Sequence, residues 1–501
     1  MKRFSYFLLG GGILINLLGG CNLNEPKNLP SAHVTPTQDQ VAYQQQELIG
    51  FIHFTVNTFT NKEWGYGDES PEIFNPTNLD TEQWAKVASE AGMKELILTA
   101  KHHDGFCLWP SKYTEHSVAN SPYQDGQGDI VKEFTAACRK YGLKPGLYLS
   151  PWDRNHAKYG QPEYIEYYRN QLVELLTNYG EIAEVWFDGA NGGDGYYGGA
   201  NEERRIDKTT YYDWDSTWAL VKKLQPKAMI FSDAGPDVHW IGNEKGIAGE
   251  TFWSTMSTDE ILPGQADQEY LNTGDPDGDK WIIGQCDVSI RPGWFYHPAE
   301  DSLVKSAEYL ADLYYKSVGR NGILLLNLPP DRRGLIHEND VKNLKGFREI
   351  LDQTFAEDYA DGAEATASNF REQHQKFSPQ NVLDGDLKTF WTVDDDATDQ
   401  TLTLKLAEPA IIDQIMLQEP IHLGQRISAF TVEGLVEGEW QPLSEATTIG
   451  YKRLLRFDPV ELSELRVIIR ESRYTPAIAE IGLYRSPSIM EGKELANKSA
   501  Y

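Results

Sequence analysis

The sequence predicts an α/β fold, a (β/α)8-like barrel, followed by a C-terminal β-sandwich. Between residues 48 and 350, short β-branched or aliphatic runs alternate with stretches whose apolar residues recur with helical period. After residue 367 the pattern changes to short segments of alternating polarity separated by turn residues, which is typical of an antiparallel sandwich. A chain of 501 residues is long enough for both units.

Eight runs in the first unit read as strands, which is the number that a closed barrel needs. An open doubly wound sheet is the competing arrangement, but the span of the repeat and the lack of a GxGxxG loop after the first strand favour the barrel. The clearest strands are expected at 49–54, 95–100, 144–149, 182–187, 228–232 and 323–328, and weaker ones near 248–253 and 281–288.

Helices are expected between these strands. Apolar residues recur with helical spacing over 84–91, and Asp80 with Gln83 three residues later predicts a capping box at the start of that helix. Cys138 lies on a similar apolar stripe with Phe134, so we expect it in the core and not as a reactive thiol.

Changes of composition suggest where the units begin and end. The barrel is expected to occupy residues 41–355. A small, acidic stretch at 356–366 reads as a linker, 367–486 as the sandwich and 487–501 as an unstructured tail. Strands of the sandwich are expected at 401–406, 411–417, 429–434 and 465–470.

The N-terminus reads as an export signal. Residues 2 and 3 are a basic pair, residues 6–18 form an apolar run too short for a stable transmembrane helix, and small residues lead into Cys21. This arrangement resembles the lipobox of bacterial lipoproteins, which implies a signal peptide at 1–20, lipid attachment at Cys21 and a polar linker at 21–40. The alternative is an ordinary cleaved signal peptide. In both cases we expect an exported bacterial protein, periplasmic or anchored to the outer membrane.

Composition narrows the range of partners. The chain has 46 Lys and Arg against 75 Asp and Glu, a formal net charge of −29, which repels nucleic acid and anionic lipid headgroups. A membrane is therefore expected as a partner only through a lipid anchor. Aromatic residues make up 12% of the chain, and such side chains suit the apolar faces of sugars. The four cysteines include no CxxC pair, so neither a disulfide framework nor a structural zinc site is expected.

The predicted strand ends are rich in reactive and ligand-binding groups. In barrels of this type the C-terminal ends of the strands carry the active site, so these groups are expected in one cleft. Five successive strands lead into His53, into His102 and His103, into Tyr148 and Trp152, into Asp188, and into the stretch from Asp233 to Glu244.

Two reaction classes use such a cleft. Paired carboxylates can hydrolyse a glycosidic bond while imidazoles and aromatic rings hold the sugar. Alternatively, histidines and aspartates can bind a catalytic metal ion. The metal pattern is weaker here, because no second histidine follows His53 two residues on, and the adjacent side chains of His102 and His103 would point to opposite faces of a strand.

Four stretches of the barrel carry a family resemblance: HFTVNTF (53–59) with EWG (63–65), HHDGF (102–106), YLSPW (148–152) and VWFDG (185–189). They resemble the α-L-fucosidases of glycoside hydrolase family twenty-nine, which have a (β/α)8-like barrel followed by a β-sandwich and work with retention of anomeric configuration. The resemblance implies that Asp188 is the nucleophile, that Trp294 is an aromatic wall near the methyl group of the sugar, and that catalysis requires no cofactor. The residues that match the fucose pocket are His53, Glu63, Trp64, His102, His103 and Tyr148, with Trp152 as a further aromatic candidate.

The acid/base residue is implied by a separate stretch. Residues 235–244 (GPDVHWIGNE) resemble the branch of the family specific for α-1,3/1,4-linked fucose, in which the glutamate of Gly-Asn-Glu is the acid/base. This nominates Glu244, with Glu250 as the competitor. The separation from Asp188 is 244 − 188 = 56 residues, longer than expected in that branch, because 191–211 reads as an insertion. A retaining mechanism predicts about 5–5.5 Å between the two carboxyl groups.

The second unit shows its own resemblance. Residues 381–392 and 477–485 look like the edges of a discoidin-like sandwich, a fold shared with galactose-binding carbohydrate modules. In that fold an Asp-Gly turn and a late glutamate surround a calcium ion, and hard oxygen ligands suit calcium. The alternatives are a plain tight turn and a unit that only braces the barrel. The structural calcium candidates are Asp384, Asp386, Thr389 and Glu480.

Together these features predict an exported exo-α-L-fucosidase that removes α-1,3/1,4-linked fucose from branched, Lewis-type glycans. The alternatives are a fucosidase of broader linkage preference, a non-catalytic glycan-binding lipoprotein and a metal-dependent hydrolase. The expected partner is a fucosylated oligosaccharide or glycoconjugate, and the sequence predicts no oligomeric state.

Overall fold

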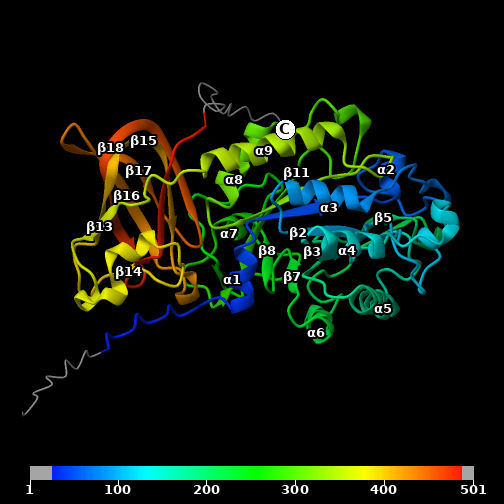
Figure 1. Cartoon of the computed structure of the whole chain (residues 1–501). Helices are drawn as coiled ribbons and strands as arrows, with labels where there is room; N and C mark the ends of the chain where they lie inside the picture. The colour runs from blue at the N-terminus through cyan, green and yellow to red at the C-terminus, as the bar shows by residue number, and fades with distance from the viewer. Residues whose placement is uncertain (1–24, 488–501) are drawn as a thin grey trace, which may run out of the picture.

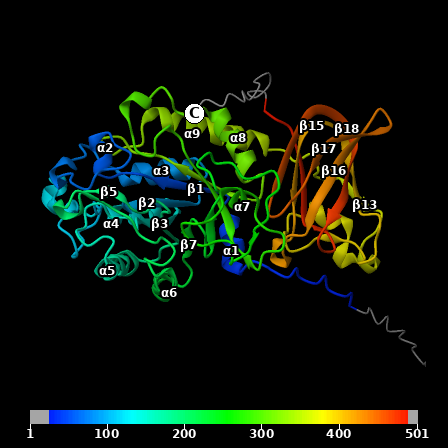
Figure 2. The ribbon, with the colours of Figure 1, turned by 180° about the vertical axis from the view of Figure 1, so that it is seen from behind.

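A computed structural model describes residues 25–487, which form two units side by side, a barrel and a β-rich unit (Figure 1, Figure 2). Eight parallel strands close the barrel, so the predicted fold class is confirmed. Their order around the barrel is β1 (Leu48–Ile52), β12 (Ile323–Asn327), β11 (Ile283–Ser289), β8 (Val238–Trp240), β7 (Met229–Ser232), β4 (Glu184–Trp186), β3 (Lys144–Leu149) and β2 (Glu95–Lys101).

Helices surround the barrel and bury their apolar faces against the outer side of the strands (Figure 1). Asp80 caps α3 (Thr81–Glu90) by accepting hydrogen bonds from the backbone N–H groups of Glu82 and Gln83. The second half of the predicted capping box is wrong, because the Gln83 side chain bonds the backbone of Ile336 instead. The other helices are α1 (Gln38–Gln44), α2 (Val56–Thr60), α4 (Ile130–Lys140), α5 (Glu163–Asn178), α6 (Trp214–Leu224), α7 (Gln268–Thr273), α8 (Ala307–Ser317) and α9 (Glu338–Thr354).

One of the two weak strand predictions is wrong. The run at 248–253 is a loop outside the barrel, and its apolar character comes from Ala248 and Phe252, which pack against Cys286. The sixth barrel strand along the chain is β8, whose three residues are too few to show a period-2 pattern. The other weak candidate, at 281–288, is confirmed as β11.

Helix α1 closes the N-terminal end of the barrel. Tyr43 donates its hydroxyl hydrogen bond to Glu184 at 2.6 Å, and Gln285 donates to Tyr43 at 2.7 Å. One layer higher, Trp186 Nε1 donates to Gln285 Oε1 at 2.8 Å. Burial and the nearby charge of Glu95 raise the pKa of Glu184 well above its usual value. Hydrogen-bonded polar side chains therefore fill the barrel interior below the site.

The second unit is an antiparallel sheet folded around its own core. Two long strands, β15 (Thr401–Gln418) and β18 (Arg453–Ser472), pair along their length with register shifts that let them bend. The predicted strands 401–406 and 411–417 are thus two halves of β15. The stretch predicted as a linker already contributes to this core, because Ala365 is buried within a strand. The remaining strands are β13 (Glu364–Ala367), β14 (Trp391–Thr392), β16 (Ile427–Val436), β17 (Glu439–Ala446), β19 (Ala477–Ile478) and β20 (Glu480–Tyr484).

The remaining strands of the barrel unit lie in its loops, and they form two short antiparallel pairs. β5 (Gly193–Gly195) pairs with β6 (Glu202–Arg204), and β9 (Thr255–Met256) pairs with β10 (Lys280–Trp281).

Cys107, Cys138 and Cys286 are buried free thiols. Between residues 25 and 487, no helix is long and apolar enough to cross a bilayer. The signal peptide, Cys21 and nearly all of the predicted tail lie outside the described residues.

Candidate active site

Asp188 follows β4 at the C-terminal mouth of the barrel. Its Oδ1 accepts a hydrogen bond from the backbone N–H of Ala190 at 2.6 Å, and its Oδ2 accepts one from the hydroxyl of Tyr148 at 3.0 Å. His103 Nε2 lies 3.9 Å from the same Oδ2. Burial raises the pKa of Asp188 to about 6, although the two hydrogen bonds oppose this shift. The carboxyl is therefore fixed in orientation and ionised above that pH, which suits a nucleophile.

Three histidines line the site after β1 and β2. His53 Nδ1 lies 2.8 Å from Asn327 Oδ1, and His103 Nδ1 lies 2.7 Å from Ser150 Oγ. The ring of His102 lies between them, with centroids 5.6 Å from His53 and 4.1 Å from His103. Burial lowers the pKa of His53 and of His103 to about 3 and that of His102 well below its usual value. All three are neutral near pH 7 and can hydrogen-bond a neutral ligand.

The expectation that His102 and His103 point to opposite faces of a strand is wrong. Strand β2 ends at Lys101, so both histidines lie beyond it, where the backbone no longer alternates. Within the described range, 25–487, no three His, Cys, Asp or Glu side chains are arranged to hold a metal ion. The metal-dependent alternative therefore lacks a ligand set in this part of the chain.

Glu63 and Trp294 come from loops far apart in the sequence and meet at the mouth of the site. Glu63 accepts hydrogen bonds from the backbone N–H groups of Trp294 at 2.9 Å and Phe295 at 3.2 Å. The carbonyl of Trp294 accepts a hydrogen bond from Asn327 Nδ2 at 2.8 Å, and its ring centroid lies 5.2 Å from that of His53. These predicted pocket residues therefore form one connected wall.

Glu244 contacts the same tryptophan. Trp294 Nε1 donates a hydrogen bond to Glu244 Oε2 at 3.1 Å. The Glu244 side chain reaches solvent, yet the surrounding chain removes enough water to raise its pKa, and the negative charges of Asp188 and Glu63 raise it further. A carboxyl group whose pKa is raised beside a second carboxyl group has the property that a general acid needs.

The competing glutamate lies elsewhere. Glu250 pairs with Arg320 of the barrel and with Arg453 of β18, the latter at 3.0 Å between Nη2 and Oε2. These ion pairs hold Glu250 at the contact between the two units. Glu244, by contrast, hydrogen-bonds Trp294 at the site, and the charge of Asp188 raises its pKa.

Two tryptophans stand beside His103 at the edge of the site. Trp64 exposes 51% of its surface and lies edge-on to His103 and to Trp152, with centroids 5.3 and 5.6 Å apart. Trp152 is buried, and its Nε1 donates to the hydroxyl of Tyr197 at 3.0 Å. Trp64 is therefore open to solvent, whereas the buried ring of Trp152 packs against it.

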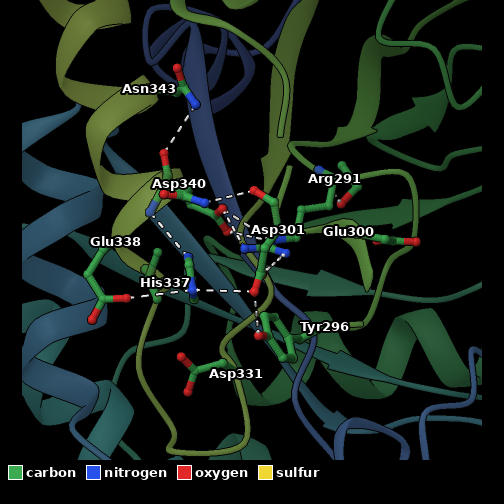
Figure 3. Close-up of polar contacts among 12 residues, drawn as sticks. Arg291, Tyr296, Glu300, Asp301, Asp331, His337, Glu338, Asp340 and Asn343 are labelled. Atoms are coloured by element: carbon green, nitrogen blue, oxygen red, sulfur yellow. Dashed lines mark hydrogen bonds and ion pairs between the residues drawn. The ribbon is translucent and has the colours of Figure 1, made fainter. Parts of the chain in front are cut away.

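A buried arginine holds the loop that carries Trp294. The Nε of Arg291 donates to both Asp340 oxygens, at 2.9 and 3.1 Å, and its Nη1 donates to Asp301 at 2.9 Å (Figure 3). Tyr296 donates its hydroxyl to the other Asp301 oxygen at 3.3 Å. Because Arg–carboxylate pairs of this kind fix geometry as well as charge, the network ties the loop to helix α9.

Asn327 and Asp287 are functional candidates that sequence reasoning missed. Asn327 ends β12 and joins His53 to Trp294. Asp287 is buried on β11, its Oδ1 has no hydrogen-bond partner within residues 25–487, and burial together with the charge of Glu244 raises its pKa well above the usual value. Both residues lie at or near the ends of buried barrel strands, so the same strand-end argument applied to the last two strands would find them.

The predicted calcium residues gather at one turn of the second unit. Thr389 Oγ1 donates to Asp384 Oδ2 at 2.7 Å, and the Asp386 N–H donates to Asp384 Oδ1 at 2.9 Å. Glu480 Oε2 accepts a hydrogen bond from the N–H of Gly385 at 3.1 Å. Burial, with the charge of Asp384, raises the pKa of Glu480 to about 7. The donor chemistry suits calcium, but Asp384, Asp386 and Glu480 are not arranged as a metal site in this structure, where their carboxylates accept hydrogen bonds from the turn.

Comparison with known proteins agrees with this site. A family model described as "Alpha-L-fucosidase" matches residues 33–354. The chain belongs to the α-L-fucosidase family. A second model, described as "F5/8 type C domain", matches residues 364–481, so the second unit is discoidin-like, as predicted. "Alpha-L-fucosidase 1" of Arabidopsis thaliana is 44% identical to this fucosidase over 454 residues, which cover 90% of this chain and 87% of that protein.

Solved structures extend the likeness over both units. A putative α-L-fucosidase from Bacteroides thetaiotaomicron is 39% identical with a TM-score of 0.84, covering 92% of this chain and 100% of the other. A Ruminococcus gnavus glycoside hydrolase family 29 fucosidase, solved in complex with fucose, is 33% identical with a TM-score of 0.82, covering 93% and 97%. This fucosidase is thus a glycoside hydrolase of family 29.

Proposed function

We propose that this fucosidase removes terminal α-1,3/1,4-linked L-fucose from branched, Lewis-type glycans with retention of anomeric configuration. The observation that carries the mechanism is the pairing of an oriented carboxyl group with a second carboxyl group whose pKa is raised by burial and by the charge of the first. Tyr148 and a backbone N–H orient Asp188, while Trp294 holds Glu244, whose pKa the charge of Asp188 raises.

In the first step, an oxygen of ionised Asp188 attacks the anomeric carbon while Glu244 gives its proton to the leaving oxygen. The bond between the anomeric carbon and that oxygen breaks, and a covalent fucosyl-enzyme forms. Asp188 is then an uncharged ester, so its charge no longer raises the pKa of Glu244. Glu244 is consequently a better base for the second step, in which it takes a proton from the water that releases fucose.

The linkage preference rests on the resemblance of the stretch that ends at Glu244 to the α-1,3/1,4 branch. The neutral histidines and the wall of Glu63 and Trp294 suit an uncharged sugar, and the open face of Trp64 suits its apolar side. Because a non-catalytic glycan-binding protein has no need of a coupled carboxyl pair, Asp188 and Glu244 favour the enzyme.

The deciding experiment measures fucose release from α-1,2-, α-1,3- and α-1,4-linked fucosyl oligosaccharides side by side. We expect the α-1,3 and α-1,4 linkages to be cleaved in preference, and NMR to detect the α-anomer of fucose first. Asp188→Ala should abolish turnover, and Glu244→Gln should reduce it by about 10²–10⁴-fold. Glu250→Gln is the matched control and should retain activity. Equal rates on all three linkages would favour the broader specificity, and first release of the β-anomer would contradict retention.

We also propose that the protein is an exported lipoprotein modified at Cys21. The support is the sequence of residues 1–21 alone, which lie outside the described part of the chain. Labelling of the full-length chain with an alkyne-tagged fatty acid in a bacterial host tests it, with Cys21→Ser as the control. Equal labelling of the two chains would contradict the assignment.

A further inference from the structure

The insertion at 191–211 is a fixed part of the active-site mouth. It leaves the barrel just after Asp188 and forms the hairpin of β5 and β6. Arg154 anchors this hairpin, because its Nε donates to the Asp194 carbonyl at 2.8 Å and its Nη2 to the Asp194 carboxylate at 2.9 Å. The residues that follow the hairpin are therefore held near the site.

Lys208, which follows the hairpin, lies in a chain of contacts that leads to the nucleophile. A Cβ placed on Gly264 would lie 2.5 Å from the Lys208 Cβ and 2.8 Å from its Cδ, so the lysine stem lies directly against Gly264. The N–H of Gly264 donates to Asp233 Oδ2 at 2.6 Å. Asp233 in turn packs on Gly189, where a Cβ would lie 3.3 Å from the same Oδ2. Gly189 is the residue after Asp188.

The ammonium of Lys208 is unpaired in the described part of the chain. Within residues 25–487 it makes no ion pair or hydrogen bond, whereas neighbouring cations of the insertion are paired, Arg204 with Glu202 at 2.8 Å and Arg205 with Glu203 at 2.6 Å. The positive charge of Lys208 favours the ionised forms of Asp188 and Asp233.

The other groups that face Asp188 cannot supply this charge. The histidine that contacts it, His103, is neutral, and Tyr148 is an uncharged hydroxyl. The remaining titratable neighbours are the uncharged hydroxyl of Tyr168 and three carboxyl groups, whose negative charges would disfavour a second anion beside them. These three are Asp233, Glu244 and Asp287.

We propose that Lys208 is a positioning residue that keeps the nucleophile Asp188 ionised among these acidic neighbours. The inference rests on the proposed role of Asp188. This role gives the insertion a function in the reaction, because the insertion supplies the cation Lys208 to a site whose other charged groups are carboxylates from the barrel. Lys208 needs no contact with the sugar to act in this way, because its effect reaches the reaction through the charge state of Asp188.

The test is the pH dependence of kcat/KM on 4-nitrophenyl α-L-fucoside for the wild type, Lys208→Met, Lys208→Arg and Arg205→Met. The acidic limb reports the ionisation of the nucleophile. We expect Lys208→Met to move that limb up by about half a pH unit, the effect of losing one partly screened opposite charge. Lys208→Arg keeps the positive charge, so its acidic limb should coincide with that of the wild type. Arg205→Met removes a solvent-exposed charge that follows β6 and is paired with Glu203, so it should leave the limb unchanged.

A second measurement isolates the nucleophile from the acid/base residue. 2-Deoxy-2-fluoro-α-L-fucosyl fluoride carries a leaving group that needs no proton, so its rate of covalent inactivation follows the ionisation of Asp188. The same upward shift is expected for Lys208→Met. An acidic limb that coincides with the wild type, or an equal loss of activity at every pH in both Lys208 variants, would overturn the inference. Normal turnover in Asp188→Ala would instead overturn the proposed nucleophile, so the two failures are distinguishable.

Discussion

The indole N–H of Trp294 donates to Glu244 at 3.1 Å while the backbone N–H of the same residue donates to Glu63 at 2.9 Å. One residue thus links the predicted sugar-binding wall to the candidate acid/base. The hydrogen bond to Glu244 favours its ionised form, whereas burial and the charge of Asp188 favour the protonated form. The protonation of Glu244 is therefore set by a balance between these effects.

Replacing Trp294 with phenylalanine keeps a ring in the wall but removes the indole N–H. Because that hydrogen bond lowers the pKa of Glu244, its loss should raise the pKa and move the alkaline limb of kcat/KM to higher pH. A hydrogen bond to a charged group contributes about 1.5–3 kcal/mol, which corresponds to a shift of about one pH unit or more. Trp440→Phe, in the second unit, is the matched control. An alkaline limb that stays in place would show that the hydrogen bond does not govern Glu244.

The loop that carries Trp294 should depend on the planar fork of Arg291. Lysine keeps the charge but cannot contact Asp340 and Asp301 with the same fixed geometry, so Arg291→Lys should loosen the loop. We expect kcat/KM to fall about 10-fold or more, since displacing groups that position a substrate carries a large penalty. Arg348→Lys alters an exposed pair with Asp352 and serves as the control. Equal kinetics in the two variants would contradict the role of Arg291.

The barrel itself is predictable because most of its strands are buried on both faces. Strand β12, for example, is a continuous apolar run that ends in Asn327, as parallel strands covered by helices are. Strand β8 is too short to carry such a signal. The loop at 248–253 imitates a strand because Phe252 packs against the outside of β11. A local pattern of apolar residues cannot distinguish the buried loop at 248–253 from a barrel strand, because both are buried and only the strand pairs with its neighbours.

The active site is also only partly predictable from the sequence. The family motifs correctly predicted that Asp188 and the pocket histidines lie at the C-terminal mouth of the barrel. The difference between Glu244 and Glu250 is made by partners far away in the sequence, Trp294 for the first and Arg453 for the second. Lys208 likewise acquires its neighbours through the contact with Gly264. Such tertiary contacts leave no spacing signal in the chain.

The turn at Asp384 provides a test of calcium binding in the second unit. Ca²⁺ needs ionised ligands, and the pKa of Glu480 is raised to about 7, so binding should release a proton and weaken as pH falls below that value. We expect Ca²⁺ to raise Tm at pH 8 relative to EDTA, with a smaller effect at pH 5.5, and Asp384→Asn to remove the difference. A ligand at 100 times its Kd stabilises by about 2.7 kcal/mol, which is easily measured. Equal Tm values in Ca²⁺ and EDTA at pH 8 would leave the residues as a plain turn.

A buried carboxyl at the base of the barrel should make stability depend on pH. Glu95 Oε2 accepts a hydrogen bond from Gln46 Nε2 at 3.0 Å, but its Oε1 has no partner within residues 25–487, and burial raises its pKa to about 7 from an ordinary value of 4.5. The folded protein therefore keeps a proton that the unfolded chain gives up. The free energy of unfolding should fall as pH rises from about 4.5 to about 7 and then level off.

Glu95→Gln replaces this carboxyl with an uncharged group of the same shape. The variant should be more stable than the wild type at pH 8, by a free energy on the order of 1–3 kcal/mol, since each unit of pKa shift corresponds to about 1.4 kcal/mol. The difference should vanish near pH 4.5, where Glu95 is protonated in the folded wild type. Urea unfolding at pH 4.5, 6 and 8 measures both values, and exposed Glu72→Gln is the control. A variant less stable than the wild type at pH 8 would mean that Glu95 is ionised and well solvated in the folded barrel.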